Sequence, residues 1–277
     1  MPITRRAVLK AFAATAATAV TGAGAYGYFD ERRQLSITRS DLHLPTLPRA
    51  LDGLRVGFLT DVHCSRWMSP DDVRHAALQL RDEHPDLIVL GGDYVTWGDR
   101  THVRPSAESL SSLSAHHGVF GILGNHDDDR DMPAALSARG IVVLKDARTR
   151  LTIRGETIDL VGIRFWTKRL TDIAALMRGA SRTVFLLAHD PRRLTEAAAL
   201  KVPLVLSGHT HGGQVVLPVV GPIAAQKFPV IAGVATRGQT TMFVSRGIGT
   251  VYVPVRINCP PEIAVLTLRS GMNRVAA

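Results

Sequence analysis

The chain has 277 residues, of which 45% are hydrophobic and 21% are charged, and 28 Arg and 5 Lys give it a formal net charge of +9 at pH 7. This is an ordinary globular composition with only short polar runs, which excludes extensive disorder. The basic balance favours anionic partners such as phosphate esters or acidic envelope polymers. No Lys/Arg block is interleaved with aromatic residues, so we expect no nucleic-acid partner.

Residues 1–29 are predicted to be a targeting segment. A basic start with Arg5, Arg6 and Lys10 precedes 19 uncharged residues rich in Ala, Thr and Gly. The run T-R-R-A-V-L-K resembles the twin-arginine export signal. We therefore expect the twin-arginine export machinery as a partner and a periplasmic, cell-wall or membrane-associated location. Ala23-Gly24-Ala25 offers a cleavage site, but about 20 such residues also span a bilayer, so cleavage and retention as an anchor both stay open.

Residues 30–50 are predicted to be a linker, because prolines punctuate the stretch between residues 44 and 49. Residues 51–270 are predicted to form the folded domain, and residues 271–277 a C-terminal tail. Within the domain, the apolar run at residues 55–60 predicts a strand buried on both faces. Ser69-Pro70-Asp71-Asp72 then predicts a helix start, with Ser69 as the N-cap. The apolar residues after this cap are spaced as one helical face: Val73, Ala76, Ala77 and Leu80.

Later apolar runs predict further buried strands at residues 86–90, 119–123, 141–144, 183–188 and 203–206, with helices between several of them. Residues 151–160 are typical of a β-hairpin. Beyond Gln214, short apolar runs separated by Gly and Pro continue to Leu268. This alternation predicts an α/β fold with a mixed sheet system in one domain.

A polar cluster follows each of five predicted strands. Ligand sites in α/β sheets gather beyond the carboxyl ends of the strands, and glycine lets the backbone turn sharply towards such a site. We therefore expect separate loops to bring these side chains to one place. The clusters are Asp61-Val-His63, Gly91-Gly92-Asp93, Gly124-Asn125-His126-Asp127, His189 and Gly208-His209-Thr210-His211.

The residue types in these clusters suit metal ions. Imidazole and carboxylate ligands bind Mn, Fe and Zn, and no set of four thiolates is present. A carboxylate can bridge two cations. Two cations about 3.5–4 Å apart lower the pKa of a shared water and hold both oxygens of an in-line phosphoryl displacement. Because G-H-x-H is expected only about 0.04 times by chance in such a chain, the clusters together predict a two-metal centre.

The motifs D-x-H, G-D, G-N-H-D, H and G-H-x-H together resemble those of the calcineurin-like metallophosphoesterases. The resemblance extends over roughly residues 54–268. The stretches PDLIVLGGD, LSGHTHGGQ and VSRGIGTVYVPVRINCPPEI are similar to the exported YaeI/YkuE-like phosphodiesterase branch in particular. The resemblance implies a sandwich of two mixed β-sheets flanked by α-helices, in the order α/β/β/α, with a dinuclear centre at the sheet edge.

The resemblance also implies roles for single residues. The catalytic group would be His126, an imidazole that binds no metal and stabilises or protonates the leaving group. Asp127 is expected to orient His126 or its loop. The cofactors would be two divalent or mixed-valence metal ions (Mn, Fe or Zn). Their implied ligands are Asp61, His63 and His211 for the first ion, Asp93 as the bridge, and Asn125, His189 and His209 for the second.

From this resemblance we expect a phosphoesterase that cleaves a phosphodiester or pyrophosphate bond by in-line attack of a dimetal-bound hydroxide. The branch includes enzymes similar to the UDP-2,3-diacylglucosamine hydrolases of lipid A synthesis, and export suits a lipid- or wall-linked phosphoester at the membrane. UDP-linked substrates are usually cytosolic, which leaves wall polymer and phospholipid open. Two other functions also stay open: a phosphomonoesterase, and a non-enzymatic envelope-binding protein on the same scaffold.

Several segments beside these motifs have two interpretations. Residues 212–214 either line the pocket or turn the chain into the next strand. Arg246 and Arg256 either meet substrate phosphate or form surface salt bridges. The apolar residues 218–234 either cover a lipid-bearing substrate or pack within a sheet.

Other classes of site are not supported by the sequence. Cys64 and Cys259 are too few for a disulfide scaffold or a four-thiolate zinc site, although one bridge between them stays open. Gly22-Ala-Gly24-Ala-Tyr-Gly27 matches a dinucleotide-binding pattern, but it lies in the targeting segment with no strand before it. The absence of G-x-S-x-G disfavours a serine hydrolase, and the absence of G-x-x-x-x-G-K-[ST] disfavours a nucleotide-driven motor.

Overall fold

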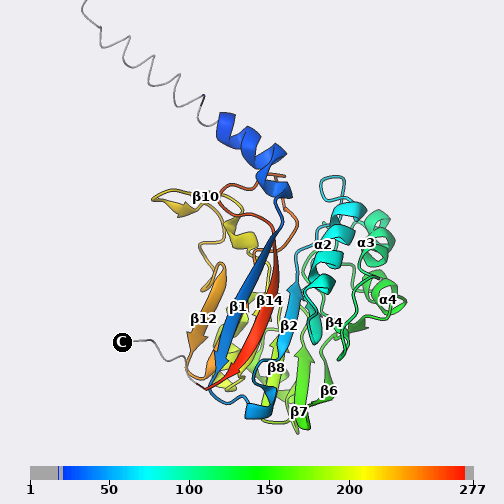
Figure 1. Cartoon of the computed structure of the whole chain (residues 1–277), viewed down its shortest axis with the longest axis vertical. Coiled ribbons are helices and arrows are strands. Elements are labelled where there is room, and N and C mark those ends of the chain that lie inside the picture. The colour runs from blue at the N-terminus through cyan, green and yellow to red at the C-terminus, as the bar shows by residue number, and fades with distance from the viewer. Residues whose placement is uncertain (1–17, 19–20, 272–277) are drawn as a thin grey trace, which may run out of the picture.

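The computed structural model describes residue 18 and residues 21–271 (Figure 1). The twin-arginine motif, at residues 4–10, lies outside the described residues. Residues 21–29 are helical, so the expected cleavage site at Ala23-Gly24-Ala25 falls within a helical segment. No helix in this described part combines the length and the apolar character that a membrane span requires.

Two six-stranded sheets form the centre of the molecule. Both are mixed, because parallel central strands are joined by antiparallel pairs such as β14 with β2 and β6 with β7. The first sheet contains, in spatial order, β1 (Ser36–Leu44), β14 (Glu262–Ser270), β2 (Arg55–Leu59), β3 (Leu87–Leu90), β4 (Val119–Gly121) and β5 (Val142–Val143). The second contains β12 (Gly233–Arg237), β13 (Thr240–Val244), β9 (Leu204–Ser207), β8 (Thr183–Leu187), β7 (Glu156–Gly162) and β6 (Ala147–Ile153).

Helices cover the outer faces of the two sheets. The first sheet is covered by α2 (Pro70–Asp82), α3 (Val103–Ser109) and α4 (Asp131–Ser137), and the second by α5 (Leu170–Leu176) and α6 (Leu194–Ala199). A small separate hairpin, β10 (Val216–Leu217) with β11 (Gly221–Pro222), projects beyond the sandwich (Figure 1). The 3-10 turns are η1 (Glu31–Arg33), η2 (Arg49–Leu51), η3 (Arg100–His102), η4 (Pro191–Arg193) and η5 (His211–Gly213).

Three hydrophobic layers hold these elements together. In β3, Leu87 and Val89 face the core between the sheets, whereas Ile88 and Leu90 face the helices outside. Because successive strand residues point to opposite faces, a strand covered on both sides reads as the continuous apolar run that the sequence contains. Each fully buried aliphatic side chain contributes roughly 1.5–3 kcal/mol. The predicted α/β/β/α sandwich is therefore confirmed.

The linker predicted at residues 30–50 is wrong for most of its length. Ser36–Leu44 forms β1 and pairs in parallel with β14, and Leu42 and Leu44 are buried in the central core. The segment before it is also held, because the Glu31 carboxylate accepts hydrogen bonds from the backbone N–H groups of Asn258 and Cys259. The folded domain therefore begins before residue 51, because β1 lies within residues 30–50 and is a strand of the first sheet.

The other predicted elements occur where expected, with shorter strands. Residues 119–123 and 141–144 were expected as strands, but β4 ends at Gly121 and β5 has two residues. The helix start at Ser69 is confirmed in detail. The Ser69 hydroxyl accepts from the Asp72 backbone N–H while the Asp72 carboxylate accepts from the Ser69 N–H, which is a capping box.

Candidate metal centre

The structure brings six of the seven predicted ligands into two adjoining groups. Each residue in a group offers one ligand atom, and these atoms lie within 4.8 Å of one another. The groups are Asp61, His63 and His211, and Asp93, His189 and His209. Their members come from loops that follow β2, β3, β8 and β9, so strand ends far apart in the sequence meet at one edge of the sandwich.

The ligands themselves take an uncommon backbone conformation. Five of the six have positive φ, with values between 48° and 72°. Side-chain-bearing residues in this left-handed region cost of order 1–3 kcal/mol each and persist where the surrounding structure enforces them, which is frequent at functional sites. These five residues are Asp61, His63, Asp93, His209 and His211.

At two positions beside the ligands only glycine fits, because any side chain there would overlap a ligand carboxylate. A Cβ on Gly124 would collide with Oδ1 of Asp93, and a Cβ on Gly208 would collide with Oδ2 of Asp61. The glycines in the G-N-H-D and G-H-x-H motifs therefore allow a carboxylate to pass close to the backbone. This is a different reason from the sharp turn expected from the sequence.

Hydrogen bonds to backbone carbonyls fix the tautomers of two imidazoles. The Nδ1 of His189 lies 2.8 Å from the carbonyl oxygen of Gly91, and the Nδ1 of His211 lies 3.3 Å from that of Gly249. A carbonyl only accepts, so Nδ1 carries the proton in each ring and Nε2 presents a lone pair when the ring is neutral. Both Nε2 atoms face inward, to the place where the carboxylates lie.

These lone pairs face carboxylate oxygens at short range. His211 Nε2 lies 3.3 Å from Oδ1 of Asp61, and His189 Nε2 lies 3.1 Å from Oδ2 of Asp93. Two acceptors at such distances repel unless a metal ion or, in the metal-free protein, a proton on the ring stands between them. The donor set of imidazoles and carboxylates therefore fits a pair of metal ions.

Asp93 lies between the two groups. Its Oδ1 accepts a hydrogen bond from the His126 backbone N–H at 2.8 Å, which leaves Oδ2 free of that bond. Oδ2 lies 3.1 Å from His189 Nε2 in its own group and 3.5 Å from His63 Nε2 in the other. One oxygen that faces both groups fits the predicted bridging role.

Asn125, the seventh predicted ligand, lies outside both groups but lines the same cleft as Asp93, His126 and His209. Its Oδ1 is buried and has no hydrogen-bond partner among the described residues. A buried amide oxygen without a partner costs roughly 1–3 kcal/mol. This oxygen is therefore free to coordinate a cation, which supports the predicted role of Asn125 at the second metal.

Burial and mutual charge set the protonation of the ligands. Burial lowers the pKa of His63 to about 4 and that of His209 to about 3, so both rings are neutral at pH 7 and present lone pairs. Burial would also lower the pKa of His189, but the carboxylates of Asp93 and Asp61 outweigh it and raise that pKa to about 10. Without a metal, a proton on His189 thus compensates the carboxylates, and a cation would replace it.

His126 lies at the cleft in an orientation suited to proton transfer. Its Nδ1 accepts a hydrogen bond from the Trp97 backbone N–H at 3.1 Å, so the proton of the neutral ring is on Nε2. Burial lowers the pKa of His126, which favours that neutral form at pH 7. His126 belongs to neither ligand group and lines the same cleft as Asp93, and its catalytic role stays a prediction.

Asp127, predicted to assist catalysis by orienting His126 or its loop, positions loops and does not line the cleft. Its carboxylate accepts from the backbone N–H groups of Asp93 and Gly124 at 2.8 Å and of Tyr94 at 2.7 Å. These bonds use both oxygens and tie the G-G-D loop to the G-N-H-D loop. The expected effect on the loop is therefore seen, and the hydrogen bonds run to backbone amides and not to the His126 ring.

The comparison with known families agrees with this geometry. The calcineurin-like phosphoesterase family profile matches residues 54–213, more than half of the chain. The chain belongs to the calcineurin-like phosphoesterases. The uncharacterized metallophosphoesterase YkuE of Bacillus subtilis is 31% identical over 97% of this chain and 98% of its own length. The phosphodiesterase YaeI of Escherichia coli is 31% identical over 96% and 99%.

Solved structures support the fold of this calcineurin-like phosphoesterase. The NAD nucleotidase of Haemophilus influenzae superposes with a TM-score of 0.50 and 14% identity, over 69% of this chain and 44% of that chain. At this level of identity the likeness extends to the architecture alone. The family, the fold and a metal-dependent hydrolytic centre thus agree with what the sequence motifs predicted.

Aromatic residues that the sequence did not indicate surround the phosphoesterase centre. The His209 ring lies 5.1 Å from the Phe165 ring and 5.0 Å from the Phe228 ring, and the His126 ring lies 4.4 Å from the Trp97 ring. Trp97 in turn contacts Tyr252 at 5.5 Å. No motif marks these residues, because they come from loops whose positions depend on the completed fold.

The two arginines with open interpretations have different roles. Arg246 forms an ion pair with Glu262 at 2.8 Å, as one of the two interpretations expected. Both interpretations are wrong for Arg256, whose side chain is fully buried. Its guanidinium donates to the backbone carbonyls of Cys259, Gly247 and Gly249, at 3.0, 3.0 and 2.6 Å. Because Gly249 also accepts from His211, Arg256 supports the loop behind a ligand.

The structure also shows the state of the two cysteines and the place of residues 218–234. Cys64 and Cys259 are both free and buried, so no bridge joins them. Residues 218–234 add no strand to either large sheet before β12 begins at Gly233. Ile223 and Phe228 from this segment line the cleft at the metal centre, whose volume is about 630 Å³. Most of the segment therefore lies outside the two large sheets and borders the site; only Gly221–Pro222, in the small hairpin, and the first two residues of β12 pair in a sheet.

Gln214 connects the G-H-x-H motif to the loop that carries Tyr252. Its Oε1 accepts from the Val251 N–H at 2.6 Å, and its Nε2 donates to the carbonyls of Val253 and Val255 at 3.0 and 3.2 Å. Val251, Tyr252 and Val253 form one wall of the cleft. Gln214 thus positions this wall relative to the metal ligands.

We expect Gln214→Ala to raise KM for bis-p-nitrophenyl phosphate several-fold while kcat and metal content stay near those of the wild type. The variant leaves backbone groups of the loop without partners, each at a cost of about 1–3 kcal/mol, and so loosens the wall without touching a ligand. Gln214→Glu keeps only the acceptor for Val251 and should give an intermediate KM. Gln79→Ala, on the exposed face of α2, is the control; an unchanged KM in Gln214→Ala would contradict the role.

Proposed function

We propose that this metal-dependent phosphoesterase is an exported phosphodiesterase of the cell envelope, and that its substrate is an amphiphilic phosphodiester or pyrophosphate. The position of Asp93 Oδ2 between the two ligand groups is the observation that carries the hydrolytic part of this proposal. When bound, two cations supply an activated water and neutralise charge on the phosphoryl oxygens. Asp61, His63 and His211 would hold one ion, and Asp93 with His189, His209 and Asn125 the other.

The chain's own residues provide the proton for the leaving group. His126 is neutral with its proton on Nε2, and it lines the same cleft as Asp93 and Asn125. A leaving oxygen seated there would take this proton as the ester bond breaks. The backbone N–H of Trp97 keeps the ring in the donating tautomer, and the surrounding aromatic rings restrict its movement.

The walls of the cleft support an amphiphilic substrate. The lining combines metal ligands and His126 with the apolar and aromatic side chains of Ile223, Phe228, Tyr252 and Val253. A cleft of about 630 Å³ holds a ligand of ordinary metabolite size, and apolar walls bind it through the area they bury. A nucleotide sugar with acyl chains, such as UDP-2,3-diacylglucosamine, and a phospholipid both combine a phosphoester with apolar chains.

The location outside the cytoplasm is supported by the sequence of the N-terminus. Arg5 and Arg6 followed by 19 uncharged residues suit a twin-arginine signal, which is a route for proteins that carry their cofactors. An exported enzyme has access to envelope lipids and wall polymers, whereas UDP-linked precursors are usually cytosolic. Among amphiphilic phosphoesters, this favours an envelope lipid as the substrate.

Chelation and a comparison of two chromogenic esters test the proposal. We expect chelator-treated protein to lose turnover of bis-p-nitrophenyl phosphate and to melt at lower temperature, because Asp61 and Asp93 then lie buried without their cations. Adding Mn²⁺, Fe²⁺ or Zn²⁺ should restore both. The diester should be cleaved faster than p-nitrophenyl phosphate. Faster cleavage of the monoester would favour a phosphomonoesterase, and a metal-loaded protein with no turnover would favour a binding protein.

A further inference from the structure

Large apolar side chains are exposed at the end of the molecule where the described chain begins. Residues 21–29 and the β10–β11 hairpin lie at this same end in Figure 1. Val220 is 68% exposed in the hairpin, Phe29 is 62% exposed, and Tyr252 is 80% exposed at the cleft. We call this surface the apolar rim and define it by Phe29, Trp67, Val219, Val220, Tyr252 and Val253.

The members of the apolar rim come from neighbouring segments. The hairpin that carries Val219 and Val220 begins beside the loop of Tyr252, where the Val216 N–H donates to the Ile257 carbonyl at 2.9 Å. The Tyr28 ring lies 5.9 Å from the Trp67 ring, which joins the N-terminal segment to the loop before α2. A second cleft, of about 440 Å³, is lined by Trp67, Tyr252 and Val253 together. Tyr252 and Val253 also line the cleft at the metal centre. The rim therefore extends from the N-terminal segment to the mouth of the active site.

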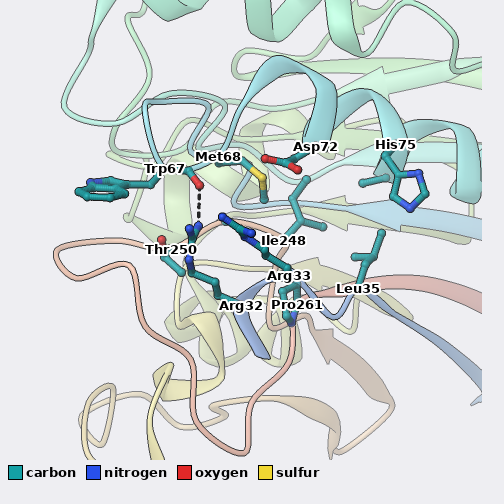
Figure 2. A pocket seen from close by; sticks show the side chains of 12 residues that line it. Arg32, Arg33, Leu35, Trp67, Met68, Asp72, His75, Ile248, Thr250 and Pro261 are labelled. Atoms are coloured by element: carbon teal, nitrogen blue, oxygen red, sulfur yellow. Dashed lines mark hydrogen bonds between the residues drawn. The ribbon is translucent and has the colours of Figure 1, made fainter. Parts of the chain in front are cut away.

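The N-terminal segment is held firmly against this surface. Arg32 donates from NH1 to the Trp67 carbonyl at 2.8 Å, and Figure 2 shows its side chain between Trp67 and Thr250. The Gly27 carbonyl accepts from the Arg256 N–H at 3.2 Å. The helical residues 21–29 thus leave the body of the molecule at the rim (Figure 1).

Cationic side chains stand among these apolar groups. The Arg66 guanidinium lies 4.6 Å from the centre of the Trp67 ring, and the Lys227 amine lies 5.5 Å from that of Phe228. Arg33 lines a third cleft beside Arg32 (Figure 2). Apolar and aromatic side chains next to basic ones match the interface of a bilayer that contains anionic lipids.

We infer that the apolar rim docks on the surface of an anionic phospholipid bilayer and holds the mouth of the active cleft against it. The inference rests on the proposed function for the source of the substrate, which would then pass from the bilayer into the cleft along Tyr252 and Val253. A second copy of the chain is a less suitable partner for the apolar rim than a bilayer, because like charges would meet in the contact. A two-fold contact through this surface brings Arg66 and Lys227 of each copy towards the same residues of the other.

A fluorescent label at a single position tests the docking. Cys64 and Cys259 are buried, and burial raises the pKa of each thiol, so an exposed new cysteine can be labelled selectively in the full chain. We propose Val220→Cys in the rim and Val234→Cys, which is 48% exposed on β12, as the matched control. Each carries an environment-sensitive nitrobenzoxadiazole label and is mixed with vesicles of phosphatidylcholine and phosphatidylglycerol.

With vesicles, the label at Val220→Cys should shift to shorter wavelength and brighten, and the label at Val234→Cys should not change. High salt or pure phosphatidylcholine should weaken the shift. No shift, or equal shifts at both positions, overturns the inference. A shift that grows with protein concentration without vesicles also overturns it and favours self-association. Turnover of soluble bis-p-nitrophenyl phosphate is measured on both labelled proteins, so an enzyme that is active but does not dock contradicts the docking surface alone.

Discussion

Asp93→Ala is expected to lose both metal ions and to lower turnover of bis-p-nitrophenyl phosphate to background. Oδ2 of Asp93 faces His189 in one ligand group and His63 in the other, so its removal weakens both sites at once. The cations supply several kcal/mol of transition-state stabilisation, which corresponds to a loss on the order of 10⁴-fold. Metal content by elemental analysis and steady-state turnover are the two measurements.

Asp159→Ala is the matched control for this variant. Asp159 is as inaccessible to solvent as Asp93, but it lies on β7 and is paired at 3.1 Å with Arg150 of the edge strand β6. Its loss should lower the melting temperature while the protein retains its metals. Full metal occupancy in Asp93→Ala would show that the bridging assignment is wrong, even if that variant were inactive.

His126→Ala is expected to keep its metals and to lose about 10²–10⁴-fold in turnover of a diester with an alkyl leaving group, as general acid catalysis predicts. His126 makes its side-chain hydrogen bond to the Trp97 N–H, and it belongs to neither ligand group. The loss should be smaller with p-nitrophenolate, since that leaving group departs without a proton. The ratio of the two losses is what distinguishes a proton donor from a merely structural residue.

His75→Ala, on the exposed surface of α2, serves as the control for this measurement. Its metal content and both rates should equal those of the wild type. If His126→Ala lost the same factor with both leaving groups, protonation by His126 would be excluded. If it lost metal, the imidazole would have to be counted among the ligands.

The sandwich and the ligand set were readable from the sequence because both depend on local patterns. A strand buried on both faces must be a continuous apolar run, as at residues 86–90, and a ligand must follow such a strand to reach the sheet edge. Asp61, Asp93 and His211 follow this rule. The capping residues at Ser69 predicted the start of α2 for the same reason, because a cap acts within one turn.

What the sequence could not predict depends on contacts between distant segments. SITRSDLHL in β1 has few apolar residues, and its strand character comes from pairing with β14. An arginine is usually expected at the surface, and the sequence does not show that loop carbonyls bind the guanidinium of Arg256 inside the protein. Trp97 and Tyr252 meet only when two loops, more than a hundred residues apart, are placed by the completed sheets.

The pairing of β1 with β14 has a consequence for how the protein is made. Thr38 hydrogen-bonds Glu262, 224 positions away, and β14 lies between β1 and β2 in the first sheet. A nascent chain therefore lacks an interior strand of this sheet until residues 262–270 leave the ribosome, and until then β2, which leads to Asp61, has no neighbour on that side. Contacts of such long range slow folding. The strand that leads to Asp61 is therefore fully paired only after β14 has joined the sheet, and a truncation before Glu262 would leave the ligands without a common scaffold.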